Sequence, residues 1–331
     1  MTGPVVVDFH AHHFPEGLPD LAATTGDQRW PSLVVDDSPR LMQGATVFRQ
    51  VRPPCFDVTS RVAELDASGV ERQVISPVPV TLVDWAPPKE AAAFLAAQND
   101  GLIDASRRSD GRLLALGAVP LQDPDLAIAE MARIMSAGMV GIEITAMVDG
   151  CELDDPRFEP FWAAAAQEQV PVFIHPAHQR IATRRSGMPY EFGIGMLTDT
   201  ALAAAALVYG GVLDRHADLR IALSHGCGTF GWTHPRLRLM AARNASAAAH
   251  LDDLVRSLWV DTLVFDTALL PILVDRFGAD HIMFGTDHPF FPGALDEQQA
   301  MLRDTKSVAS GLHDGCLGAN ALDFLGLRPE A

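Results

Sequence analysis

Short apolar runs alternate with helix-like segments along most of the chain. The strand-like runs cover 5–9, 73–76, 113–119, 140–145, 172–175, 220–225, 258–262 and 282–285. Apolar residues at three- and four-residue spacing predict helices over 57–68, 89–107, 125–137, 156–169 and 199–209, from about 235, and over 268–277. Near-continuous apolar strands separated by helices are typical of a parallel sheet. Eight such units in roughly 280 residues predict an α/β fold, a TIM (β/α)8 barrel forming one domain over 1–331.

The rival architecture is an open, doubly wound sheet. That fold places a glycine-rich phosphate-binding loop after its first strand, and no such pattern follows residues 5–9. Residues 14–56 break the alternation, because they are rich in proline, glycine and aspartate and show little periodicity. A loop of this length inside a domain is usually functional or an inserted subdomain, so we expect 14–56 to cover the active site.

Charge and composition narrow the classes of partner. The 331 residues carry a formal net charge of −17, which argues against nucleic acid or an anionic membrane as a partner. A small anionic substrate would then need local arginines. Neither a signal peptide nor an apolar run of the length of a membrane span is visible, so we expect a cytoplasmic protein. The four cysteines form no CxxC pair, which favours free thiols over a thiolate metal site.

Five polar residues stand at the carboxyl ends of predicted strands. His10 and His12 close the first strand, where a period of two puts both side chains on one face. His175, His225 and Asp287 close the fifth, sixth and eighth strands. In a TIM barrel these strand ends meet at one rim, which is where the chemistry of such enzymes lies. The alternative for each histidine alone is an ordinary core or surface residue.

Three imidazoles and a carboxylate predict a site for one divalent metal ion. Zinc fits such ligands, with manganese or another first-row metal as alternatives. If His10, His12, His175 and Asp287 are the ligands, His225 is left to move protons as the catalytic residue. The contrary assignment makes His225 a fourth imidazole ligand.

These motifs resemble the amidohydrolase superfamily. The stretches with the strongest likeness are 10–15, 48–49, 120–123, 138–142, 224–230 and 285–290, and they look like the aminocarboxymuconate semialdehyde decarboxylase branch. Many members bind two metals bridged by a carboxylated lysine on the fourth strand. The two lysines here, Lys89 and Lys306, are not on that strand, which instead carries Glu143. A lysine-bridged pair is therefore excluded. Glu143 remains a conceivable bridge, but we favour a single ion.

The resemblance also implies roles for individual residues. It implies the ligand set His10, His12, His175 and Asp287, with His225 activating the metal-bound water. It implies that Arg49 holds the substrate carboxylate and that Arg236 reaches the site of a neighbouring subunit, so that a homodimer is the active form. A second arginine expected on the same helix falls on Asn244.

Some of these residues also have ordinary interpretations. Arg49 and Arg52 are alternatively solvated loop charges, and Arg236 alternatively pairs with a surface carboxylate. His178 stands where the family has an acid, so the pocket wall differs. We expect His178 to contact substrate, with a proton relay or a loop role as alternatives.

The function predicted from these observations is metal-dependent, non-oxidative decarboxylation of a small unsaturated or aromatic carboxylic acid. The alternative is a metal-dependent hydrolase or hydratase acting on a small ester, amide, lactone or unsaturated acid, because fold and metal site alone do not separate the two. A third possibility is a binding module without catalysis. It is disfavoured because residues that activate water would have no role in such a module.

Overall fold

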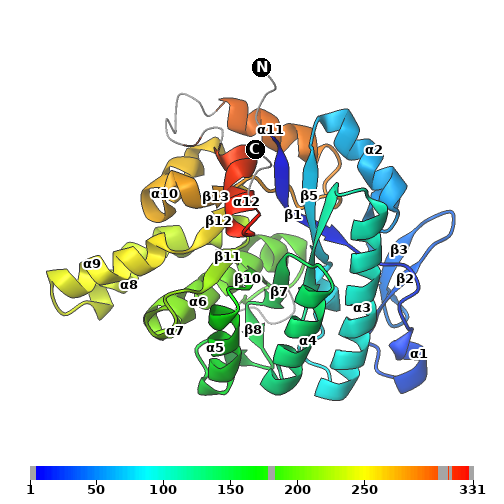
Figure 1. Cartoon of the computed structure of the whole chain (residues 1–331), viewed down its shortest axis with the longest axis horizontal. Coiled ribbons are helices and arrows are strands. Elements are labelled where there is room, and N and C mark those ends of the chain that lie inside the picture. Colours follow the sequence, from blue (N-terminus) through cyan, green and yellow to red (C-terminus); the bar gives the residue numbers. More distant parts are fainter. Residues whose placement is uncertain (1–4, 178–182, 305–311, 313–314, 328–331) are drawn as a thin grey trace.

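The computed structural model describes residues 5–177, 183–304, 312 and 315–327, and it confirms the predicted barrel (Figure 1). Its strands are β1 (Val7–His13), β5 (Arg72–Pro77), β6 (Leu113–Ala118), β7 (Gly141–Thr145), β10 (Pro171–His175), β11 (Arg220–Leu223), β12 (Trp259–Asp261) and β13 (Ile282–Met283), paired in this order. Every pair is parallel. The N–H of Phe9 donates to the carbonyl oxygen of Phe284 (2.7 Å), which joins the first strand to the end of the last.

Helices follow the strands; the predicted ones are present among the described residues, and those at 212–215, 245–256, 294–304 and 320–324 were not predicted. They are α2 (Val58–Ser68), α3 (Pro88–Arg108), α4 (Pro124–Ser136), α5 (Glu159–Gln167), α6 (Met196–Tyr209), α7 (Val212–Arg215), α8 (Phe230–Ala241), α9 (Ala245–Arg256), α10 (Leu270–Phe277), α11 (Ala294–Asp304) and α12 (Asn320–Phe324). Capping residues fix where a helix begins and ends. In α2, the Asp57 carboxylate accepts from the N–H of Ser60, and Gly69 ends the helix in the left-handed conformation.

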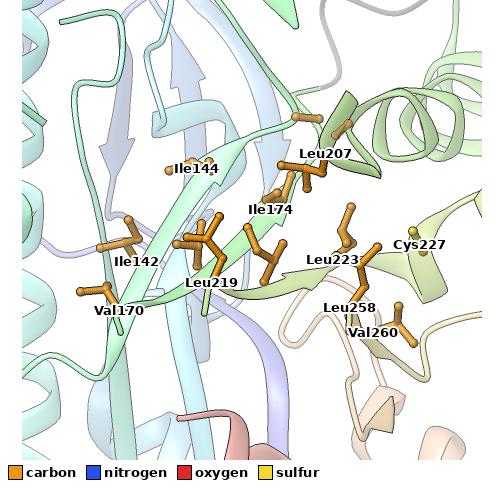
Figure 2. Packing of buried hydrophobic residues seen from close by; sticks show 14 of the residues in the cluster. Ile142, Ile144, Val170, Ile174, Leu207, Leu219, Leu223, Cys227, Leu258 and Val260 are labelled. Atoms are coloured by element: carbon orange, nitrogen blue, oxygen red, sulfur yellow. The ribbon is translucent and has the colours of Figure 1, made fainter. Parts of the chain in front are cut away.

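The barrel is filled on both faces of its sheet. Side chains such as Ile142, Ile174 and Leu223 point outward from their strands into a buried layer that also contains Leu207 of α6 (Figure 2). Inside the barrel, the Phe9 ring makes edge-to-face contacts with Phe173 (5.1 Å) and with Phe324 of α12 (5.3 Å). The lumen is therefore a packed core, and in this fold the ligand site lies at the carboxyl ends of the strands.

The segment 14–56 is more regular than we expected. It contains α1 (Leu21–Thr25) and an antiparallel sheet of β2 (Pro31–Val34), β3 (Arg40–Gln43) and β4 (Thr46–Gln50). The description of this stretch as irregular was wrong, because strands of four or five residues are too short to show a clear alternation. Its tightest turn needs Gly44, whose φ is +53° and where a Cβ would lie 2.3 Å from Oε1 of Gln28.

The helical region after β11 also differs from the prediction. Helix α8 begins at Phe230 rather than near Pro235, and a separate helix, α9, follows it. Pro235 has no N–H to donate to the carbonyl oxygen of Gly231. That oxygen accepts instead from Nε of Arg276 (3.2 Å), so the helix runs through the proline. In Figure 1, α8 and α9 extend away from the barrel as an arm.

One helical run passes a test for a membrane span by length and composition alone. It comprises residues Pro189–Tyr209, with a mean hydropathy of 1.5 over its most apolar window. In the fold, 44% of that window is buried. The run includes α6, which packs on β10, α8 and α9. Part of its apolar character therefore serves packing within the fold.

Candidate active site

The five polar residues at the predicted strand ends meet at one rim of the barrel. Nε2 of His10 lies 3.2 Å from Nε2 of His12, which lies 3.3 Å from Oδ1 of Asp287. The ring of His175 lies 4.9 Å from that of His12 and 5.0 Å from that of His225. Two triplets have ligand atoms within 4.8 Å of one another: His10, His12 and Asp287, and His10, His175 and His225. The second triplet leaves both assignments of His225 open.

The hydrogen bonds of three imidazoles determine which nitrogen faces the rim. Nδ1 of His10 lies 2.7 Å from Oδ2 of Asp261, Nδ1 of His12 lies 2.8 Å from the carbonyl oxygen of Pro77, and Nδ1 of His175 lies 3.0 Å from that of Pro176. A carbonyl oxygen only accepts, so the proton of a neutral ring sits on Nδ1 and the Nε2 lone pair is free.

The free lone pairs converge on one point, and this arrangement fits a cation. Nε2 of His175 is buried and has no hydrogen-bond partner among the described residues. Neutral imidazoles fixed through Nδ1 by an acceptor are the usual form of histidine metal ligands. Without a cation, lone pairs would face one another at this point. The donor set therefore suits a divalent ion.

Asp261 is a functional residue that the sequence analysis missed. Besides its contact with His10, its carboxylate accepts from the backbone N–H groups of His225 (2.8 Å), Gly226 (2.9 Å) and Leu263 (3.0 Å). One buried carboxylate thus orients an imidazole and holds the loop that carries His225. The sequence contained a signal for Asp261, because this residue stands at the end of β12, just as the other polar residues stand at the ends of their strands.

Burial and neighbouring charges shift the pKa values of the histidine and aspartate side chains in this cluster, and the two influences often oppose each other. Burial lowers the pKa of His175 well below its ordinary value and lowers that of His225 to about 4. Burial is the largest influence on His10 and opposes its charged form, but the hydrogen bond to Asp261 and the charges of Asp261, Asp287 and Asp8 together outweigh it and raise the pKa. Burial opposes the ionised form of Asp287 as well, and His12 and His10 nevertheless lower its pKa. The cluster therefore favours neutral His175 and His225 beside an ionised Asp287.

The loops that carry His225 and Asp287 have an unusual backbone. Both residues have φ of +56°, and Cys227 and Phe265 are also left-handed, at +66° and +57°. This conformation is uncommon for residues other than glycine and persists where the surroundings over-determine it. The strain concentrates in the loops after β11, β12 and β13, around the polar cluster.

Glu143, the residue on the strand that carries lysine in many relatives, lies in none of the candidate metal triplets. Its two carboxyl oxygens are buried, and the Ser76 hydroxyl partly favours their ionised form. Burial, helped by the charge of Asp287, raises its pKa well above the ordinary value. Such a carboxyl favours the neutral acid, which is a poor metal ligand.

A cavity of about 480 Å³ opens over the polar cluster. Its floor contains His12, His175, His225 and Asp287. Its walls are mainly apolar and are formed by Phe48, Val78, Pro79, Val80, Met188, Pro189, Phe192, Met196, Leu197, Leu263, Val264, Phe265, Leu269, Phe290 and Phe291. The size is that of cavities that enclose a small organic ligand.

Arg49, from β4 of the inserted segment, is a cation in this apolar wall. Its guanidinium lies 4.3 Å from the centre of the Phe290 ring, which in turn stacks on His12 at 5.6 Å. Burial lowers its pKa, and Asp287 partly offsets this. No hydrogen bond or ion pair of this guanidinium is found within the described part of the chain. A partly buried cation with only rings beside it is a ready site for an anion.

The remaining predicted residues lie elsewhere. Arg236 is exposed on α8 and does not line the cavity of its own chain. His178 lies outside the described residues. Arg52 pairs with Glu64 (2.5 Å), which also bonds His288 (2.9 Å), so its charge is already engaged.

Comparison with known proteins agrees with the geometry. The profile of the family described as amidohydrolase matches residues 7–327. The chain belongs to the amidohydrolase family. Among curated relatives of this amidohydrolase, 2-amino-3-carboxymuconate-6-semialdehyde decarboxylase of Dictyostelium discoideum is 31% identical over 98% of this chain and 92% of that protein. The gamma-resorcylate decarboxylase of Rhizobium radiobacter is 29% identical over 88% and 89%. The predicted resemblance is thus confirmed.

Solved structures of low identity share the amidohydrolase fold. Metarhizium anisopliae IDCase in apo form superposes with a TM-score of 0.82 at 22% identity, over 99% of this chain and 98% of that one. The dihydroxybenzoic acid decarboxylase of Polaromonas sp. JS666 superposes with 0.77 at 20% identity, over 100% and 98%. That structure holds manganese and the inhibitor 2-nitroresorcinol. A divalent metal and a small aromatic ligand therefore occur on this fold.

Proposed function

We propose that this amidohydrolase is a metal-dependent, non-oxidative decarboxylase of a small aromatic or unsaturated carboxylic acid. The observation that carries the proposal is the joint placement of converging imidazole lone pairs and Arg49 around one cavity. The first suits a cation, and the second suits the carboxylate of a substrate. The decarboxylase names of the curated relatives support the reaction type.

The ligands that we assign to the metal are His10, His12, His175 and Asp287. Their nitrogen and carboxylate donors suit zinc, and manganese is the alternative. When bound, the ion would supply a concentrated positive charge that acidifies water and stabilises negative charge developing on oxygen. One ion is proposed, because Glu143 is not among the grouped donors.

The chain's own residues would carry the rest of the reaction. Arg49 holds the substrate carboxylate, and the aromatic walls orient the body of the acid and exclude water. The neutral His225 imidazole would take a proton from a water molecule and deliver it to the carbon that bears the carboxylate. The bond from that carbon to the carboxylate then breaks, its electron pair returns to the unsaturated system, and carbon dioxide leaves.

We further propose that the active form is a homodimer built on the arm of α8 and α9. Helix α8 exposes Trp232 (78%), Leu239 (71%) and Met240 (70%) beside Arg236, an amount of apolar surface that typically marks an interface. A second copy seated there would carry Arg236 towards the partner's cavity. Activity that stays proportional to protein through a dilution shown to yield monomers would contradict this proposal.

The test of the reaction is carbon dioxide release by the metal-loaded enzyme. A panel of benzoic, hydroxybenzoic and muconic acids is compared with matched esters, amides and lactones. We expect carbon dioxide and the protonated product from at least one acid, and no turnover of the esters. Hydrolysis without carbon dioxide would instead indicate the hydrolase alternative.

A further inference from the structure

The polarity of the cavity is strongly one-sided. The metal-competent groups lie at the floor, Arg49 lies over the Phe290 ring beside them, and the other walls are formed by aromatic and aliphatic side chains. We infer that the acid carries an extended apolar substituent, directed to the cavity mouth, and no second anionic group. This inference rests on the proposed decarboxylase function, since it concerns the substrate of that same site.

The size of the cavity supports an extended substituent. A volume of about 480 Å³ lies within the range of cavities that enclose drug-sized molecules, about 300–1,000 Å³. A single ring with a carboxylate and hydroxyl groups would leave much of the apolar wall facing water. An alkyl or aryl substituent would cover that wall, and the surface removed from water would favour binding.

The mouth of the cavity is apolar as well. Phe265 and Phe291 line it, and their rings lie 5.7 Å apart in an edge-to-face contact. They remain 59% and 41% exposed, and Leu269 beside them is 42% exposed. Phe265 also has the left-handed φ of +57°, a strained conformation for a bulky residue. A bound substituent that reaches the mouth would cover these exposed rings.

The charges of the walls argue against a second carboxylate. Among the described lining residues, Arg49 is the one permanently cationic side chain, and Asp287 is the one acidic side chain. If Arg49, joined by the Arg236 that a second copy would contribute, holds the scissile carboxylate, a second anion would lie against the rings and aliphatic side chains of the described lining. An unpaired anion in an apolar environment is strongly unfavourable.

The experiment uses metal-loaded enzyme and two series of 2-hydroxybenzoic acids, substituted at ring position 4 or 6. The substituents are hydrogen, methyl, propyl, pentyl and carboxylate. In at least one series we expect kcat/KM for carbon dioxide release to rise about two- to fourfold per methylene. The dicarboxylic acid should be the poorest substrate of its series. A flat or falling dependence in both series, or preference for the dicarboxylic acid, would overturn the inference.

A rim variant tests the direction of the substituent. Phe265→Asn removes the ring, and asparagine tolerates the left-handed backbone. We expect the loss of kcat/KM for the pentyl acid to be at least fivefold larger than the loss for the unsubstituted acid. The matched control is Val35→Asn, an exposed apolar residue (51%) outside the cavity, which should change neither. If Phe265→Asn lowers kcat/KM equally for both acids and also changes the oligomeric state, the rim is a contact between subunits. That result would overturn the inference.

Calorimetry separates failure of this inference from failure of the proposed function. Binding of each acid is measured on metal-loaded enzyme, irrespective of turnover. If no acid releases carbon dioxide but affinity rises with chain length, the proposed reaction is wrong and the apolar site stands. If carbon dioxide is released but affinity and kcat/KM do not depend on chain length, the proposed reaction is supported and the inferred substrate class is wrong.

Discussion

Two buried clusters of histidine and aspartate in this protein differ in how many of their nitrogens are occupied. At the base of the α8–α9 arm, Nδ1 of His234 lies 2.9 Å from the Tyr209 hydroxyl, and Nε2 lies 2.8 Å from Oδ1 of Asp252. Arg238 also donates to Asp252. Both ring nitrogens are therefore occupied, and the cluster joins α6, α8 and α9.

At the barrel rim, Nε2 of His175 and Nδ1 of His225 have no hydrogen-bond partner among the described residues, and Nε2 of His12 lies beside Nε2 of His10 and Oδ1 of Asp287, which are themselves candidate ligands. His10, His12 and His175 each have an acceptor at Nδ1, and their Nε2 atoms face a common point. Composition does not separate the two clusters, because both are buried histidines beside carboxylates. What separates them is whether the protein itself satisfies every nitrogen. A saturated cluster stabilises the fold, and an unsaturated one is available to bind.

Removing a rim ligand should have the largest effect. We expect Asp287→Ala or His10→Ala to lose the metal, because the remaining donors no longer enclose the ion, and activity should fall to the background rate. Elemental analysis of wild type should find one equivalent per chain. Two equivalents in the active wild type, or full metal content in either variant, would contradict the assignment.

Changing His225 should separate metal binding from catalysis. We expect His225→Asn to keep its metal and its circular dichroism spectrum while kcat falls at least about a hundredfold, as for loss of a general acid–base. Metal analysis and steady-state kinetics on one preparation check this. A metal-free variant would make His225 a ligand, and near-full activity would remove its proton-transfer role.

Asp261→Asn should weaken the rim cluster without dismantling it. The amide keeps the size of the carboxylate but loses the charge that orients His10. We expect metal affinity to fall about 10- to 100-fold, as for other residues that support metal ligands. Competition with a chromophoric chelator measures the affinity. Unchanged affinity would show that Asp261 serves only the backbone of the 225–226 loop.

Changes in the saturated cluster should affect stability and leave the metal in place. We expect His234→Ala to lower the free energy of unfolding by about 2 kcal/mol, because it removes a hydrogen bond to a charged carboxylate. Tyr209→Phe, which removes one neutral hydrogen bond, should cost about 1 kcal/mol. Urea unfolding and metal analysis check both variants. Loss of metal from either would mean that the two clusters are not independent.

Much of the fold and of the polar rim could be predicted from the sequence. The barrel strands are buried on both faces, so their apolar runs are plain, and His10, His175 and Asp287 interrupt those runs at their ends. Asp261 was missed because it was read as part of its strand, and its partners lie far away in the chain. The sheet in 14–56 was missed because its strands are short. The start of α8 was missed because a proline usually ends or begins a helix, and here a distant arginine compensates for the N–H that Pro235 lacks.

The barrel closes where β1 meets the end of β13, and this contact determines when the proposed metal site can form during synthesis. His10 and His12 leave the ribosome long before Asp287, which follows His12 by about 275 residues. The proposed ligands meet only when the segment after β13 has closed against β1, so the complete ligand set cannot assemble on a partly synthesised chain. Metal uptake would then report barrel closure.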